Sequence, residues 1–170
     1  MQPLFYELGV VYMPQDNLSI FVIGCGLRNV GDDAVGLQVV SELQRVPDLG
    51  FELRALEGDR PQGFLAEFPA DALVIFVDSM RTDAAPGTIH CMRLPSKTAR
   101  PRHLDSEETK SLQSELDHIT KRGAAVPRMF LIGVEIAEES GPGLSEKVQK
   151  SVEEVVGNFQ RYLKLARDLT

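Results

Sequence analysis

Apolar residues follow two alternating patterns along this chain. Short, nearly continuous apolar runs rich in β-branched residues predict buried strands, whereas apolar positions that recur at helical spacing predict amphipathic helices. Strands are expected at residues 20–23, 51–56, 73–77, 88–94 and 128–134. Helices are expected at residues 34–45, 61–68, 106–122 and 145–166. This alternation predicts an α/β fold with a mostly parallel sheet and helices on both of its faces.

Prolines and glycines mark several ends of these elements. Pro47 ends the first helix, and Pro86 followed by Gly87 predicts a type II turn before the fourth strand. An apolar stripe from Val148 to Leu163 predicts that the last helix is continuous.

The glycine-rich segment from Gly24 to Gly36 is the strongest candidate for chemistry. It follows the first strand, and ligands bind at the carboxyl ends of strands in open α/β sheets. The segment contains two adjacent carboxylates. Asp32 is expected to cap the following helix, because an Asp side chain accepts hydrogen bonds from the free N–H groups there. For Asp33 a capping role and a functional role are equally open.

Asp78 follows the apolar run of the third strand. Parallel strands share one carboxyl edge, so Asp78 is expected at the same edge as Asp33, either as a turn residue or in a site. Two carboxylates from different strands suit a divalent cation or acid–base chemistry. A histidine would favour nickel, zinc or iron. His90 is expected to pack within its strand and His118 to face solvent on its helix. His103, in the 94–105 loop, is the histidine within reach of this edge.

The same glycines partly match a dinucleotide-binding loop. Gly24 and Gly26 fit the first two positions of Gly-x-Gly-x-x-Gly, but Asn29 occupies the third. Asp32 and Asp33 would also place negative charge where a phosphate approaches, so this alternative is much weaker.

Composition excludes several classes of protein. The 170 residues, 43% of them hydrophobic and 25% charged, fit a single domain over residues 1–170, with 1–18 as an N-terminal extension. The net charge of −7 argues against a nucleic-acid partner.

The sequence shows neither a signal peptide nor an apolar run of membrane-spanning length, so the protein is expected to be cytoplasmic. Cys25 and Cys91 are expected to be buried free thiols.

The ordered motifs resemble those of the [NiFe]-hydrogenase maturation proteases. Asp78 at the end of an apolar strand, the 85–88 turn, the 130–134 strand and the 143–145 segment match this family in the same order, over nearly all of residues 19–165. The resemblance implies a three-layer α/β/α fold of the phosphorylase/hydrolase-like type, with a twisted, mostly parallel five-stranded sheet. Within the glycine-rich segment, the matching residues are Gly24, Gly26, Gly31, Asp32, Asp33 and Gly36.

The resemblance also implies an activity. Members of the family are endopeptidases that remove a C-terminal extension from the hydrogenase large subunit after nickel insertion. The nickel is carried by the substrate, and the protease has no cofactor of its own. The positions implied to contact this nickel are Asp33, Asp78 and Glu108, where Glu108 replaces a histidine and His103 is the alternative third ligand. Asp33 and Asp78 are the implied catalytic residues.

Two other functions remain as alternatives. The chain could be a non-catalytic paralogue that acts as a binding or assembly factor for a metalloenzyme subunit, or a small-molecule hydrolase with its own divalent ion. In the leading interpretation the partner is the large-subunit precursor. The chain is then expected to be a monomer that binds neither nucleic acid nor membrane.

Overall fold

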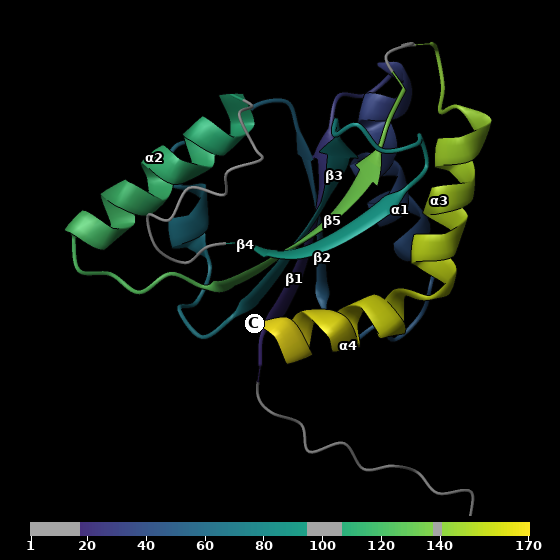
Figure 1. The fold of residues 1–170 in the computed structure, drawn as a ribbon. Helices are drawn as coiled ribbons and strands as arrows, with labels where there is room; N and C mark the ends of the chain where they lie inside the picture. The colour runs from purple at the N-terminus through teal and green to yellow at the C-terminus, as the bar shows by residue number, and fades with distance from the viewer. Residues whose placement is uncertain (1–17, 95–106, 138–140) are drawn as a thin grey trace, which may run out of the picture.

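The strands form one five-stranded sheet with helices on both of its faces (Figure 1). The computed structural model describes residues 18–94, 107–137 and 141–170 and, for residues 107–113, their backbone alone. The strands are β1 (Ile20–Gly26), β2 (Glu52–Glu57), β3 (Leu73–Met80), β4 (Ile89–Leu94) and β5 (Arg128–Glu135). The α-helices are α1 (Val35–Leu43), α2 (Glu107–Lys121), α3 (Glu146–Gly157) and α4 (Phe159–Leu169). Two short 3-10 helices are η1 (Gly31–Ala34) and η2 (Phe64–Glu67).

The sheet is parallel except at one edge. Its strand order is β2-β1-β3-β5-β4, and only β4 runs antiparallel to its neighbour, β5. The predicted turn before β4 is confirmed, because the N–H of Thr88 donates to the carbonyl of Ala85 at 3.0 Å and Gly87 has a φ of 89°. The position of β4 at the edge was not predicted. With β4 at the edge, the parallel strands β1, β3 and β5 occupy the centre of the sheet, and their carboxyl ends lie at the same edge.

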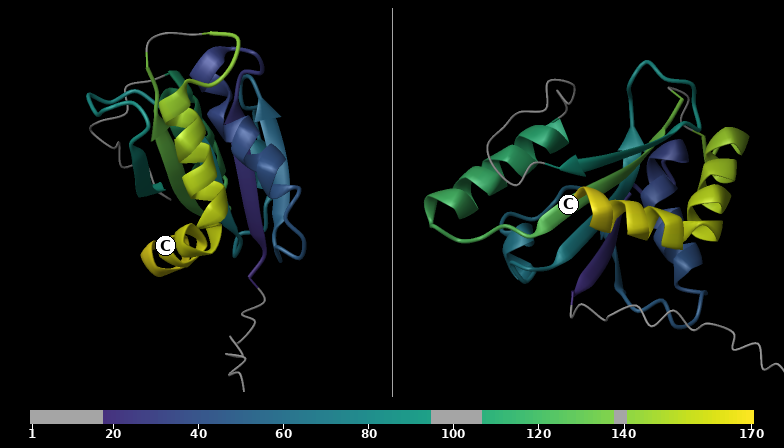
Figure 2. Two further views of the ribbon diagram at one scale, coloured as in Figure 1. Left: turned by 90° about the vertical axis from the view of Figure 1, so that its right-hand side faces the viewer. Right: turned by 60° about the horizontal axis from the view of Figure 1, so that its bottom comes forward.

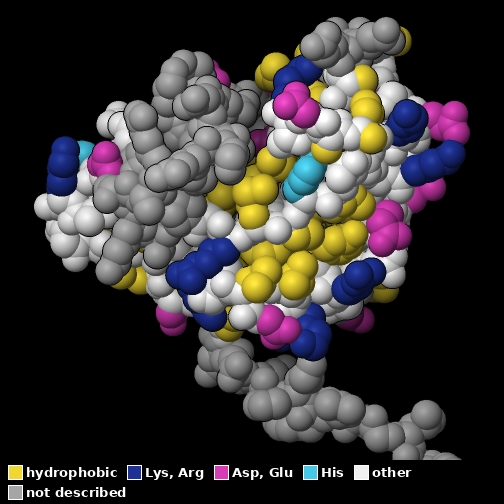
Figure 3. Space-filling model, in the orientation of Figure 1, with side chains coloured by type: hydrophobic (Ala, Val, Ile, Leu, Met, Phe, Trp, Pro, Cys, Tyr) yellow, Lys and Arg dark blue, Asp and Glu magenta, His cyan; other side chains and the backbone are white. Residues whose placement is uncertain are grey.

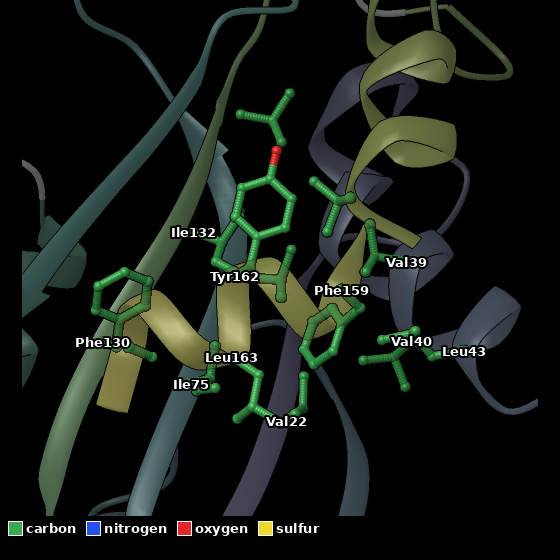
Figure 4. Close-up of a cluster of buried hydrophobic side chains, with 14 of the residues drawn as sticks. Val22, Val39, Val40, Leu43, Ile75, Phe130, Ile132, Phe159, Tyr162 and Leu163 are labelled. Carbon is green, nitrogen blue, oxygen red and sulfur yellow. The ribbon is translucent and has the colours of Figure 1, made fainter. Parts of the chain in front are cut away.

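Different helices cover the two faces of the sheet (Figure 2). Apolar side chains on each face form a separate buried cluster with these helices. On one face, fully buried side chains such as Val22 and Ile75 form one apolar cluster with residues of α1, α3 and α4, among them Phe159 and Leu163 of α4 (Figure 4). On the other face, the cluster includes Phe76 and the apolar residues of η2 and α2. The mostly parallel α/β/α arrangement predicted from the sequence is therefore confirmed.

The prediction of one continuous helix over 145–166 is wrong. The chain leaves the helical conformation at Asn158, which has φ −118° and ψ 23°, and α4 then crosses the lower part of one face of the sheet in the view of Figure 1. The physical cause is local. Gly157 has low helix propensity, and the side chain of Asn158 donates to the carbonyl of Glu154 at 3.3 Å, in competition with the helical backbone.

None of the described helices has the length and apolar character that crossing a membrane requires.

A buried glutamate holds α2 against the rest of the molecule. Glu115 is 8% exposed, and its Oε1 accepts the N–H of Leu65 in η2 at 2.6 Å. Burial raises the pKa of Glu115, an effect that the N–H of Leu65 and the charge of Arg60 partly offset. The next residue, Leu116, is fully buried in the apolar cluster on this face. These contacts fix the position of α2, whose first turn contains Glu108.

The raised pKa of Glu115 predicts a pH dependence of stability. Folded Glu115 keeps its proton to a higher pH than in the unfolded chain, so the free energy of unfolding should fall as the pH rises above the ordinary glutamate range. In Glu115→Gln this part of the dependence should disappear, because the amide oxygen still accepts the N–H of Leu65 but does not titrate. Urea unfolding of both proteins between about pH 4 and pH 7 measures the difference. An unchanged slope in the variant would show that another group is responsible.

Candidate active site

The loop that follows β1 turns back over the end of that strand. The N–H of Leu27 donates to the carbonyl of Asp33 at 3.3 Å, and the N–H of Asp33 donates to the carbonyl of Val30 at 3.1 Å. Gly26 has a φ of 148°, and a Cβ atom there would lie 2.0 Å from the carbonyl oxygen of Asp33. Only glycine permits this closure. The closure places Asp32 and Asp33 at the carboxyl edge of the sheet.

Asp32 does not cap the first helix, contrary to the prediction. Neither η1 nor α1 has a side-chain capping hydrogen bond. Asp32 is instead 3% exposed, and its carboxylate accepts the backbone N–H of Ser145 at 2.6 Å and the Ser145 hydroxyl at 3.0 Å. Because Ser145 immediately precedes α3, Asp32 joins the loop after β1 to the start of that helix. Its role is structural.

Asp33 is directed toward the end of β3. Its side chain is 30% exposed, and Oδ1 lies 3.8 Å from Nη2 of Arg81. The same Oδ1 accepts a hydrogen bond of 3.4 Å from the hydroxyl of Ser79. Arg81 is more than half exposed, so this ion pair contributes little to stability. The second of the two adjacent aspartates is therefore the one that remains accessible to a ligand.

Asp78 lies inside β3, which ends at Met80 and so continues beyond its predicted end. Asp78 is half-buried, and its Oδ1 accepts the N–H of Ser79 at 2.8 Å. Since side chains alternate along a strand, Asp78 is on the same face as Phe76, the face that α2 covers. Because β1 and β3 are adjacent parallel strands, the structure brings Asp33 and Asp78 to the same edge of the sheet. That the two carboxylates bind one ion remains a prediction.

Glu135 joins several elements at this edge, although it is not among the site residues predicted from the sequence. It is 3% exposed, and its carboxylate accepts the N–H of Thr82 at 2.5 Å and the hydroxyl of Thr82 at 2.7 Å. Its Oε2 also lies 3.1 Å from Nε2 of His90. His90 therefore pairs with a buried carboxylate and does not simply pack within β4. Because Thr82 follows Arg81, Glu135 fixes the segment that brings Arg81 to Asp33.

Comparisons with known proteins agree with this fold. No family model matches the chain. Over an alignment of 142 residues, the chain is 26% identical to a "putative hydrogenase maturation protease" of Methanocaldococcus jannaschii. This alignment covers 81% of this chain and 92% of that protein. Its structure is similar to the hydrogenase maturating endopeptidase HybD from E. coli, with a TM-score of 0.67, 24% identity and coverage of 88% and 94% of the two chains. It is also similar to the [NiFe] hydrogenase maturation protease HybD from Thermococcus kodakarensis, with a TM-score of 0.63, 18% identity and coverage of 85% and 98%.

The chain has the fold of the hydrogenase maturation proteases. The resemblance expected from the motifs is thereby confirmed at the level of the fold, including the five-stranded, mostly parallel sheet. The residues that share this edge of the maturation protease fold are Asp33, Asp78, Arg81 and Glu135.

The third predicted nickel-contacting residue lies outside the described side chains. Glu108 is in the first turn of α2, which begins on the side of the molecule where β3 and β5 end (Figure 1). The alternative ligand, His103, is outside the described residues. Within residues 18–94, 114–137 and 141–170, no three His, Cys, Asp or Glu side chains form a group that could hold a metal ion. The two carboxylates of the described part of the site are Asp33, in the loop after β1, and Asp78, near the end of the neighbouring strand β3.

Proposed function

We propose that this protein is an endopeptidase that removes the C-terminal extension of a [NiFe]-hydrogenase large subunit after nickel insertion. The observation that carries the proposal is the position of Asp33, a solvent-accessible carboxylate at the ends of two adjacent strands in a maturation protease fold. Asp78 supplies a second carboxylate from the neighbouring strand. Among the proteins with this fold, the E. coli protein is named an endopeptidase and the T. kodakarensis protein a protease.

In this proposal the nickel belongs to the substrate. Asp33 and Asp78, with Glu108 or alternatively His103 as a third ligand, bind the nickel of the precursor and so fix the peptide that is to be cleaved. The metal then polarises the scissile carbonyl group or a water molecule. Cys25 is 7% exposed, and such a buried thiol is a poor candidate for a nucleophile. The protein's own contribution is to position the nickel-bearing precursor.

The surface beside Asp33 supports a protein substrate. Leu27 is 44% exposed and Val30 is 36% exposed, although both are large apolar residues. They belong to the loop that carries Asp33, so apolar surface lies next to the candidate carboxylate. Neighbouring exposed apolar side chains are typical of surfaces that bind another protein.

A cleavage assay tests the proposal. The purified protein is mixed with an unprocessed large subunit, either nickel-loaded or nickel-free, and the product is followed by gel mobility and by mass spectrometry of the released peptide. We expect cleavage of the nickel-loaded precursor and none of the nickel-free precursor. A stable complex without cleavage would overturn the peptidase proposal and support an assembly factor. Cleavage that does not depend on nickel would contradict the proposed recognition.

A further inference from the structure

A groove of about 440 Å³ lies between the edge strand β4 and helix α4. Its apolar lining consists of Ile89 and Cys91 from β4 and Tyr162 and Leu165 from α4. Figure 3 shows apolar side chains gathered on this face of the molecule. Leu165 remains 36% exposed, and Cys91 is half-buried where the sequence predicted full burial. The groove therefore presents apolar surface to solvent.

The strand beside the groove has a free edge within the described structure. β4 pairs with β5 on one side, and its other side makes no backbone hydrogen bond to a described residue. An exposed edge of this kind can accept an additional strand, whose side chains then enter pockets on either face of the sheet. The free edge thus favours an extended peptide as the occupant.

The charges around the groove favour an acidic occupant. Lys164 is neutralised by Asp168, since their side chains are 2.6 Å apart. Arg161 at the groove and Arg93, which shares a face of β4 with Cys91, form no ion pair with the described residues. In a chain with a net charge of −7, two guanidinium groups that have no ion-pair partner among the described residues, beside an apolar groove, complement a carboxylate on the partner.

The thiol in the groove is a lining group and not a reactive one. Burial raises the pKa of Cys91, and the nearby charge of Arg161 only partly offsets this effect. The thiol is therefore protonated at neutral pH. It presents a small apolar surface to an occupant.

We propose that this groove binds an extended segment of the large-subunit precursor, with apolar and acidic side chains, as an additional strand along β4. The inference rests on the proposed function and names a second contact surface for the same substrate. The register places His90 of β4 opposite Gly133 of β5, which is itself opposite Asp78 of β3. A strand added to β4 at this level would lie three strand spacings, about 14 Å, from Asp78. The groove would then hold the precursor while its nickel site lies at the carboxylates.

Surface variants with a matched control test the groove. Leu165→Glu and Arg161→Glu change two groove residues, whereas Arg167→Glu makes the same charge reversal at an exposed position of the same helix. Affinity for the nickel-loaded precursor is measured by biolayer interferometry, and KM and kcat by the cleavage assay. We expect the groove variants to raise Kd and KM about 10-fold with kcat unchanged, and the control to stay within about two-fold. Photocrosslinking from p-benzoylphenylalanine at position 165 should label an apolar, acidic segment of the precursor.

The possible outcomes separate this inference from the proposed function. If the protein cleaves the precursor and both groove variants bind it as the unmodified protein does, the groove inference is overturned and the peptidase stands. Binding that is weakened by the groove variants, without cleavage, would support the groove and overturn the peptidase. If the protein neither binds nor cleaves the precursor, both fail. Cross-linking to a second copy of this chain would identify a dimer interface and overturn the inference.

Discussion

Replacing Asp33 by asparagine should lower the rate of precursor cleavage about 100-fold or more while leaving the protein folded. The change removes the negative charge that binds the nickel-bearing substrate but keeps the size of the side chain. Asp33 is 30% exposed and forms one long hydrogen bond and one weak ion pair, so the free energy of unfolding should change by less than about 0.5 kcal/mol. Single-turnover cleavage of the nickel-loaded precursor and a urea unfolding curve measure the two quantities. Asp78→Asn should reduce cleavage in the same way.

Asp32→Asn is the matched control, because it makes the same chemical change one residue earlier. The Asp32 carboxylate is 3% exposed and accepts two hydrogen bonds from Ser145. Losing this charged acceptor should lower the free energy of unfolding by about 1 to 3 kcal/mol. Cleavage per folded molecule should change much less than in Asp33→Asn. If Asp32→Asn abolished cleavage and Asp33→Asn did not, the assignment of the two aspartates would be reversed.

Most of the fold could be predicted from the sequence because its elements are determined locally. The apolar runs at 20–23 and 73–77 cannot be exposed to water, and both form central strands of the sheet. The strand order is not local. Placing β4 at the edge beyond β5 depends on packing between segments separated by α2, which no spacing in the sequence encodes. The break at Asn158 had a local signal in Gly157, but the apolar stripe on either side of it favoured a continuous helix.

The candidate site could be predicted only in part, for related reasons. Two acidic residues after apolar strands indicated the carboxyl edge, and the structure brings Asp33 and Asp78 to it. The structural role of Asp32 depends on Ser145, which is 113 residues away, so local capping rules gave the wrong partner. Glu135 had the same signal as Asp78, a carboxylate at the end of an apolar strand, and the sequence alone could have identified it. The groove beside β4 had no sequence signal, because it forms where α4 turns away from α3.

The position of Asp33 depends on the close approach of α1 to the sheet. Gly36, in the first turn of α1, lies directly on the backbone of two strands. A Cβ atom added to Gly36 would lie 2.1 Å from the carbonyl oxygen of Val77 and 2.3 Å from that of Cys25. Gly24 faces it, since a Cβ there would lie 2.1 Å from the carbonyl oxygen of Gly36. These contacts are with backbone, so a side-chain rotation cannot relieve them, and a larger residue must push α1 away from the strands.

Gly36→Ala should therefore lower the free energy of unfolding by about 3 kcal/mol or more, which is a large part of the stability of a domain of this size. Gly157→Ala is the matched control: no atom lies within 4 Å of a Cβ there, and alanine at the end of α3 should stabilise by about 0.5 kcal/mol. Urea unfolding with an unchanged m-value measures both effects. In any Gly36→Ala protein that stays folded, cleavage should also fall, because the displaced helix begins two residues after Asp33. Stability equal to that of the unmodified protein would mean that α1 does not pack on β1 and β3 as closely as described.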